Sequence, residues 1–123
     1  MQILIRIADI TLTATLRDTP TAQAILTALP IESRAQTWGE EVYFSTPVNV
    51  DLEADARDVV QAGEVAFWVE GSCIAIGFGP TPISLGDEIR LAARTNIWAD
   101  TQDDVRKLIT IQAGDPIHIE VLQ

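Results

Sequence analysis

The strongest constraint on the fold is an alternation of apolar and polar side chains that recurs in short segments along the chain. Isoleucines occupy every second position from Ile3 to Ile7, and the alternation returns from Ile10 to Leu16. A period of two places the apolar side chains on one face of a β-strand, and two such runs with a short link form a hairpin. The first sixteen residues therefore predict an antiparallel hairpin.

Further strands are predicted in the segments 31–38, 40–46, 64–69, 72–78, 89–98 and 116–122, with tight connections at Trp38-Gly39 and Glu70-Gly71. One helix is expected after Asp18 or Thr19 as N-cap, with Pro20 in its first turn and Pro30 at its end. A second is expected over 100–114, where Thr101 and Asp104 resemble a capping box and Gly114 follows. Many short strands and two helices predict a barrel or sandwich whose open ends the helices cover.

Length and charge restrict the class of protein. A chain of 123 residues fits one domain, residues 1–123, and 47% hydrophobic residues can form an independent core. The net charge of −10 repels phosphate backbones and anionic lipids, so neither nucleic acid nor membrane is an expected partner. The single cysteine allows no internal disulfide, and no apolar run approaches a membrane span, so a cytoplasmic location is expected.

Several kinds of chemistry lack the residues that they need. His118 is the only histidine, so the sequence offers no multi-histidine metal site and no supported Ser-His-Asp or Cys-His arrangement. Cys73 lies within an apolar run, which is typical of an unreactive core thiol. The run from Asp51 to Asp55 begins like a calcium loop, but alanines replace the required glycine and glutamate. We therefore predict no metal and no cofactor.

The segment Thr37–Val48 carries the residues most suggestive of a binding site. A two-residue connection at Trp38-Gly39 would place Gln36 opposite Glu41, Arg34 opposite Tyr43 and Glu32 opposite Ser45. One face of this hairpin is then apolar and the other polar. The polar face and the polar sides of two later strands supply the candidate ligand-binding residues Arg34, Gln36, Trp38, Glu41, Tyr43, Trp68 and Trp98.

Three segments resemble a family of small prokaryotic cyclophilin-like proteins: QTWGEEVYFSTPV (Gln36–Val48), AGEVAFW (Ala62–Trp68) and GFGPTP (Gly77–Pro82). Their order and spacing agree with that family over essentially the whole chain. The resemblance implies a mainly β fold, a closed eight-stranded antiparallel cyclophilin-like barrel capped by two helices. It implies no particular activity, because this family has no established biochemical role and a fold does not carry function.

The resemblance leaves two main hypotheses for function. The favoured one is a non-catalytic module that binds an unidentified peptide, protein or small molecule on the outer face of the barrel. The alternative is a weak or specialised peptidyl-prolyl isomerase in which Arg34 approximates the arginine of the isomerase cyclophilins. Glu40 and Glu41 stand where those isomerases carry apolar or amide groups, and carboxylates disfavour an apolar proline pocket.

A third hypothesis relates the chain to cyclophilin-like domains of amide-hydrolysing assemblies, which would need a carboxylate with a raised pKa. Glu40 and Glu41 are the adjacent acidic pair near the predicted site. Because neighbouring residues of a strand alternate between faces, the two are not expected to act as a pair.

Overall fold

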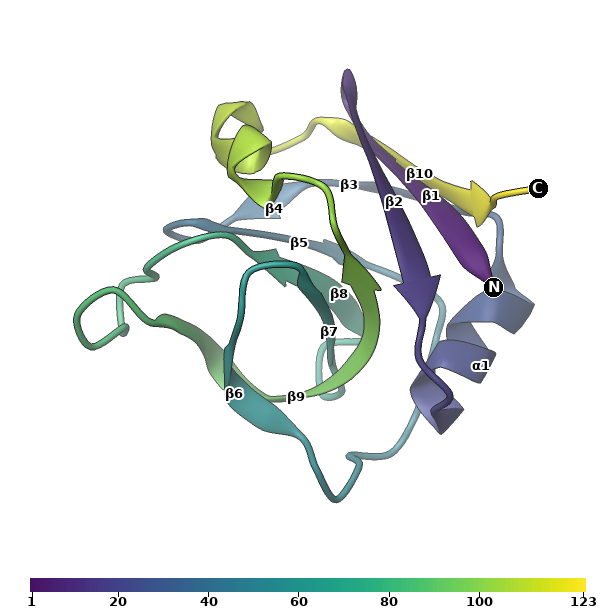
Figure 1. Cartoon of the computed structure of the whole chain (residues 1–123), viewed down its shortest axis with the longest axis horizontal. Helices are drawn as coiled ribbons and strands as arrows, with labels where there is room; N and C mark the ends of the chain where they lie inside the picture. The colour runs from purple at the N-terminus through teal and green to yellow at the C-terminus, as the bar shows by residue number, and fades with distance from the viewer.

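A computed structural model describes all residues 1–123 and forms a nearly closed antiparallel barrel (Figure 1). Nine strands follow the path β3-β10-β1-β2-β9-β7-β8-β5-β4, and β6 pairs only with β9. The elements are β1 (Gln2–Ile7), β2 (Ile10–Leu16), α1 (Pro20–Ala28), β3 (Ile31–Arg34), β4 (Gln36–Thr37), β5 (Glu41–Ser45), β6 (Arg57–Val60), β7 (Glu64–Trp68), β8 (Cys73–Gly77), β9 (Ile89–Thr101), the 3-10 helix η1 (Val105–Thr110) and β10 (Pro116–Val121).

The predicted mainly β barrel is confirmed, but its path has nine strands rather than eight. The segment that the sequence predicts as one strand, 31–38, divides at the buried residue Ala35. Its first part, β3, pairs with β10, whereas its second part, β4, pairs with β5. β3 and β4 are the two end strands of the path, so the two edges of the sheet come together at Ala35 and nearly close the barrel.

The alternation read from the sequence builds the core. Ile3, Ile5 and Ile7 of β1 are fully buried, as are Leu12 and Ala14 of the paired strand β2. Inward-facing residues of β5, β7, β8 and β10 complete the same cluster. Burial of such side chains stabilises the fold by roughly 1.5–3 kcal/mol each for the larger ones.

The first helix is confirmed and the second is much shorter than predicted. Thr19 is the N-cap of α1, and its hydroxyl oxygen accepts a hydrogen bond from the Ala22 N–H at 3.1 Å. The predicted helix over 100–114 is instead the 3-10 helix η1, because Thr101 pairs with Ala14 as the last residue of β9. Asp104 caps η1. Figure 1 shows α1 and the 105–110 turn at opposite ends of the barrel.

The peptide bond before Pro30 is cis, and those before Pro47, Pro80 and Pro82 are trans. None of the helices is long and apolar enough to cross a bilayer.

The hairpin between β4 and β5 turns one residue later than predicted. The Trp38 N–H donates to the Glu41 carbonyl at 3.1 Å, so the turn is centred on Gly39-Glu40 rather than on Trp38-Gly39. Gly39 has a φ of +57°, a left-handed conformation that glycine adopts without the strain of a Cβ. The requirement for this conformation places the glycine at the first central position of the turn.

The shift of the turn changes the cross-strand partners. Gln36 pairs with Tyr43, not with Glu41. The partner of Gln36 moves by two positions, so Gln36 and Tyr43 still share one face. Arg34 and Glu32 do not pair with β5, because they lie on β3 opposite Pro116 and His118 of β10. The inward face of β5 is as predicted, with Val42 and Phe44 in the core. All three predicted pairs are wrong: Gln36–Glu41, Arg34–Tyr43 and Glu32–Ser45.

The strand β9 connects the barrel to a second, smaller apolar layer. Its C-terminal half pairs with β2 and β7 in the barrel wall, and its N-terminal half pairs with β6. Figure 1 shows β9 as one long curved strand with β6 along its outer side. The small cluster on the outer face of β7 and β8 consists of Val60, Ala66, Ala75, Ile89, Leu91 and Ile97. The outer face of this sheet is thus covered rather than solvated.

The bend of β9 is held by a buried side-chain amide. Asn96 is fully buried, donates to the Thr21 hydroxyl and the Asp51 carbonyl, both at 2.9 Å, and accepts from the Glu53 N–H at 2.8 Å. The Glu53 carboxylate in turn accepts from the hydroxyl and the N–H of Thr21. One amide therefore joins the start of α1, the loop before β6 and the middle of β9.

We expect the substitution Asn96→Ala to lower the free energy of unfolding by about 2–4 kcal/mol, because it leaves several buried polar groups without partners. Urea unfolding followed by tryptophan fluorescence measures this change. Asn49→Ala is the matched control, since Asn49 is exposed and accepts one hydrogen bond from Ser72. Equal effects of the two substitutions would show that the Asn96 amide does not hold the bend.

Candidate functional site

Small side chains on the outer face of β8 form a trough. Cys73, Ala75 and Gly77 point away from the barrel core, whereas Ile74 and Ile76 between them are core residues. On one side β8 pairs with β5, and on the other with β7. Because the middle strand carries nothing larger than a thiol on this face, larger side chains of its neighbours enclose an empty space.

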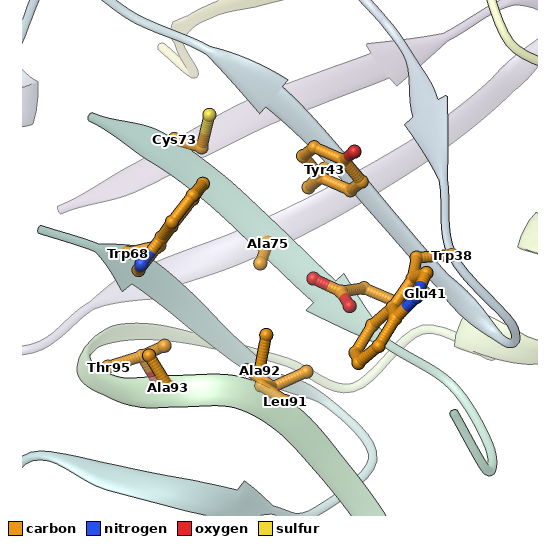
Figure 2. Close-up of a pocket in the computed structure, with 10 residues that line it drawn as sticks. All are labelled: Trp38, Glu41, Tyr43, Trp68, Cys73, Ala75, Leu91, Ala92, Ala93 and Thr95. Atoms are coloured by element: carbon orange, nitrogen blue, oxygen red, sulfur yellow. The ribbon is translucent and has the colours of Figure 1, made fainter. Parts of the chain in front are cut away.

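The trough is the floor of a hollow of about 200 Å³. Glu41 and Tyr43 of β5 stand along one side and Trp68 of β7 along the other, with Trp38 at the hairpin turn (Figure 2). The first half of β9 closes the remaining side. The lining residues are Trp38, Glu41, Tyr43, Trp68, Cys73, Ala75, Leu91, Ala92, Ala93 and Thr95.

Close backbone contacts fix the two tryptophans. A Cβ on Gly71 would lie 2.2 Å from the Trp68 ring, so the ring packs directly on the backbone of the β7–β8 turn. A Cβ on Gly39 would lie 2.8 Å from both Pro82 and Thr81, so the turn that carries Trp38 packs against the 80–82 segment. The hollow therefore has walls whose positions are set by the backbone before any ligand enters.

Glu41 is the one charged side chain that lines the hollow. It is 6% exposed, and no hydrogen bond or ion pair within the chain involves its carboxylate. The carboxylate oxygens remain accessible from the hollow, since no fully enclosed side-chain oxygen of the chain lacks a partner. Figure 2 shows the carboxylate pointing into the space between the two tryptophans. Burial without compensation raises the pKa of Glu41 to about 7.

Other partly buried acidic groups of the chain are paired. Burial opposes ionisation of Glu64, but hydrogen bonds from Arg57, at 2.6 Å, and from the Gln61 N–H outweigh it and lower the pKa of Glu64. Glu40, next to Glu41, turns to the other side and forms an ion pair with Arg106 at 2.5 Å. Glu41 thus differs from its neighbours in having no partner, and it forms no acid pair with Glu40.

The hollow brings together only part of the predicted site. Trp38, Glu41, Tyr43 and Trp68 line it, and Gln36 lies beside it, exposed and paired with Tyr43. Arg34 does not: it is exposed on β3, its guanidinium donates to the Gly114 carbonyl at 3.2 Å, and it borders a separate polar hollow.

Trp98 does not form a wall of the site. It is fully buried in the barrel core, and its indole N–H donates to the Ala66 carbonyl at 3.2 Å. Trp98 lies two residues after the polar Asn96, so the two side chains share a face of the strand, which predicts an outward tryptophan. That face is the inward one, since Asn96 is itself buried and hydrogen-bonded. An irregular register opposite Val65 and Ala66 lets both Trp98 and Ala99 face the core.

Several lining residues were missed from the sequence. Cys73 was read as a core thiol, but it borders the hollow, and burial raises the pKa of its thiol. Ala75 and the alanines of β9 were not recognised because a small side chain gives no signal of its own. The one available signal was the run of small residues at alternate positions, Cys73, Ala75 and Gly77, beside strands that carry aromatic residues.

The raised pKa of Glu41 predicts a pH-dependent stability term. The folded state keeps the proton up to about pH 7, whereas the unfolded chain releases it near the ordinary value of 4.5. Stability is therefore lost as the pH rises between these values. We expect the free energy of unfolding of the native protein to fall between pH 5 and pH 8. In the Glu41→Gln variant this fall should be smaller by on the order of 2–3 kcal/mol.

Urea unfolding of both proteins at the two pH values measures this difference, because pH effects of all other groups cancel. Glu70→Gln is the control, since Glu70 is exposed and forms no hydrogen bond or ion pair. If the difference in unfolding free energy between the native protein and Glu41→Gln does not change with pH, Glu41 titrates normally in the folded protein.

Comparisons with known proteins agree with this architecture. A family model described as Cyclophilin-like matches residues 1–120. The solution structure of the hypothetical protein AF2241 from Archaeoglobus fulgidus is similar over 98% of this chain and 93% of that chain, with 37% identity and a TM-score of 0.82. The structure of McbB in complex with tryptophan matches 97% of this chain and 44% of that chain, with 13% identity and a TM-score of 0.71, which shows the fold alone. No curated protein matches. Because the family model spans nearly all of its residues, the chain belongs to the cyclophilin-like family.

Proposed function

We propose that this protein is a non-catalytic ligand-binding module and that its ligand occupies the hollow between β5, β7, β8 and β9. The observation that carries this proposal is Glu41, a residue that is 6% exposed and whose carboxylate has no partner within the chain and faces an aromatic and apolar lining. Buried polar groups in proteins almost always have partners. A group that lacks one and faces a preformed hollow is well placed to receive it from a ligand.

The shape of the hollow supports a small ligand. Ligand sites are concave, mostly apolar and equipped with a few convergent polar groups, and this hollow has that character. Its volume is about 200 Å³. A dry cavity of roughly 150 Å³ holds a benzene-sized molecule, so the ligand, or the part of a peptide that enters, would have on the order of six to ten non-hydrogen atoms.

The prolyl isomerase alternative draws less support from the geometry. Arg34, the residue on which it depends, is outside the hollow and is hydrogen-bonded to the Gly114 carbonyl. Glu41 lines the hollow, and a carboxylate in the lining disfavours binding of an apolar proline ring. McbB, of which 44% matches this fold, has a structure in complex with tryptophan.

A fragment titration followed by amide and indole NMR signals tests the proposal. We expect fragments of up to about ten non-hydrogen atoms to shift the signals of Trp38, Glu41 and Trp68. Ala92→Phe should abolish these shifts, because Ala92 is exposed at the edge of the hollow and a phenyl ring there fills it. Arg34→Ala should leave them unchanged.

The opposite pattern would contradict the proposal. If no fragment shifts the lining signals, the hollow is not a ligand site. If Xaa-Pro peptides bind with accelerated cis–trans exchange, and Arg34→Ala abolishes it, the protein is an isomerase that works at the polar face of β3.

A further inference from the structure

We propose that the ligand of the hollow is an organic cation, a protonated or quaternary amine on a small apolar body, whose positive charge lies against the Glu41 carboxylate. This inference rests on the proposed function and names the chemical class of its ligand. It is carried by three features of the same space: the charge at its centre, the rings around that charge and the size of the enclosure.

The charge balance of the lining favours a cation. Glu41 is the one acidic side chain among the lining residues, and no lysine, arginine or histidine borders the hollow. The arginines of β9 have partners elsewhere: Arg90 binds Glu88 and Asp58, and Arg94 donates to the Ala56 carbonyl. A buried carboxylate is costly unless a positive group pairs with it, and an anionic ligand would add a second unpaired charge.

The aromatic lining favours the same ligand. Trp38, Tyr43 and Trp68 surround the carboxylate on three sides (Figure 2). The face of an aromatic ring attracts cations within about 6 Å, most strongly for tryptophan, and clusters of such rings recognise ammonium groups. A neutral apolar ligand would contact the rings but would have no favourable interaction with the carboxylate. The combination of aromatic rings and a carboxylate is therefore best explained by a cationic ligand.

The approach to the hollow also suits a positive ligand. The chain carries a net charge of −10, which raises the local concentration of cations around the molecule. The volume of about 200 Å³ limits the ligand to a compact amine. Small alkylammonium ions and phenylalkylamines have the appropriate size, whereas a folded peptide segment would enter only through one side chain.

A matched pair of probes separates charge from shape. Choline carries a quaternary ammonium, and 3,3-dimethylbutan-1-ol has the same shape without the charge. We expect NMR titration to show that choline binds about tenfold or more tightly than the alcohol. The reason is that the Glu41 carboxylate can form an ion pair with the ammonium group of choline, whereas the alcohol carries no charge. Glu41→Gln should remove this preference, and Glu32→Gln, with the same loss of charge on exposed β3, should retain it.

Proton linkage gives a second readout that does not depend on a variant. The titratable groups that face Glu41 are Tyr43 on β5 and Cys73 on β8, and burial raises the pKa of the Cys73 thiol. Choline does not titrate, so its affinity should follow the ionisation of Glu41. We expect it to rise about tenfold from pH 6 to pH 8, while that of the alcohol stays constant or falls.

The outcomes distinguish this inference from the proposed function. If the alcohol binds as tightly as choline, or if fragments shift the lining signals but choline, benzyltrimethylammonium and 2-phenylethylamine do not, the cation inference is overturned and the binding module stands. If no fragment of any charge shifts those signals, both are overturned.

Discussion

The hydrogen bonds of the buried Asn96 amide are the interaction on which the rest of the structure depends. They fix the loop that leads into β6, and β6 in turn lies against the N-terminal half of β9. That half of β9 closes one side of the ligand hollow. A single polar group in the core thus sets the position of a wall that it does not itself touch. Such an arrangement keeps the hollow open without any contact from a ligand.

The residues of the barrel core stabilise the fold, whereas Glu41 in the hollow destabilises it. The core is stabilised by burial of apolar side chains, whereas Glu41 is buried at a cost in stability that grows with pH. Proteins commonly retain such unfavourable groups where a function needs them. The contrast with Glu64, which two arginines and a backbone N–H compensate, indicates that this chain can pair a buried carboxylate and has not done so at Glu41.

Local patterns in the sequence predicted most of the fold but only part of the site. Alternation located every strand except β6 and most of the inward faces, and Thr19 with Pro20 located the first helix, because these signals depend on neighbouring residues alone. The split at Ala35, the partner of β3 and the orientation of Trp98 depend on residues far along the chain, so no local pattern contained them. The family resemblance was confirmed. The hairpin register placed Arg34 opposite Tyr43, whereas Arg34 lies on β3 opposite Pro116 and borders a separate polar hollow.

The alternation of side chains along β8 separates the packing of the barrel core from the size of the hollow on its outer face. Ile74 and Ile76 pack in the barrel core, while Cys73 and Ala75 on the same strand form the floor of the hollow. Exchanges between small residues at these two outward positions can therefore alter the depth of the hollow without disturbing the inward packing. Relatives that share this barrel are free to diverge in what they accommodate, one outward position at a time, while their cores remain alike.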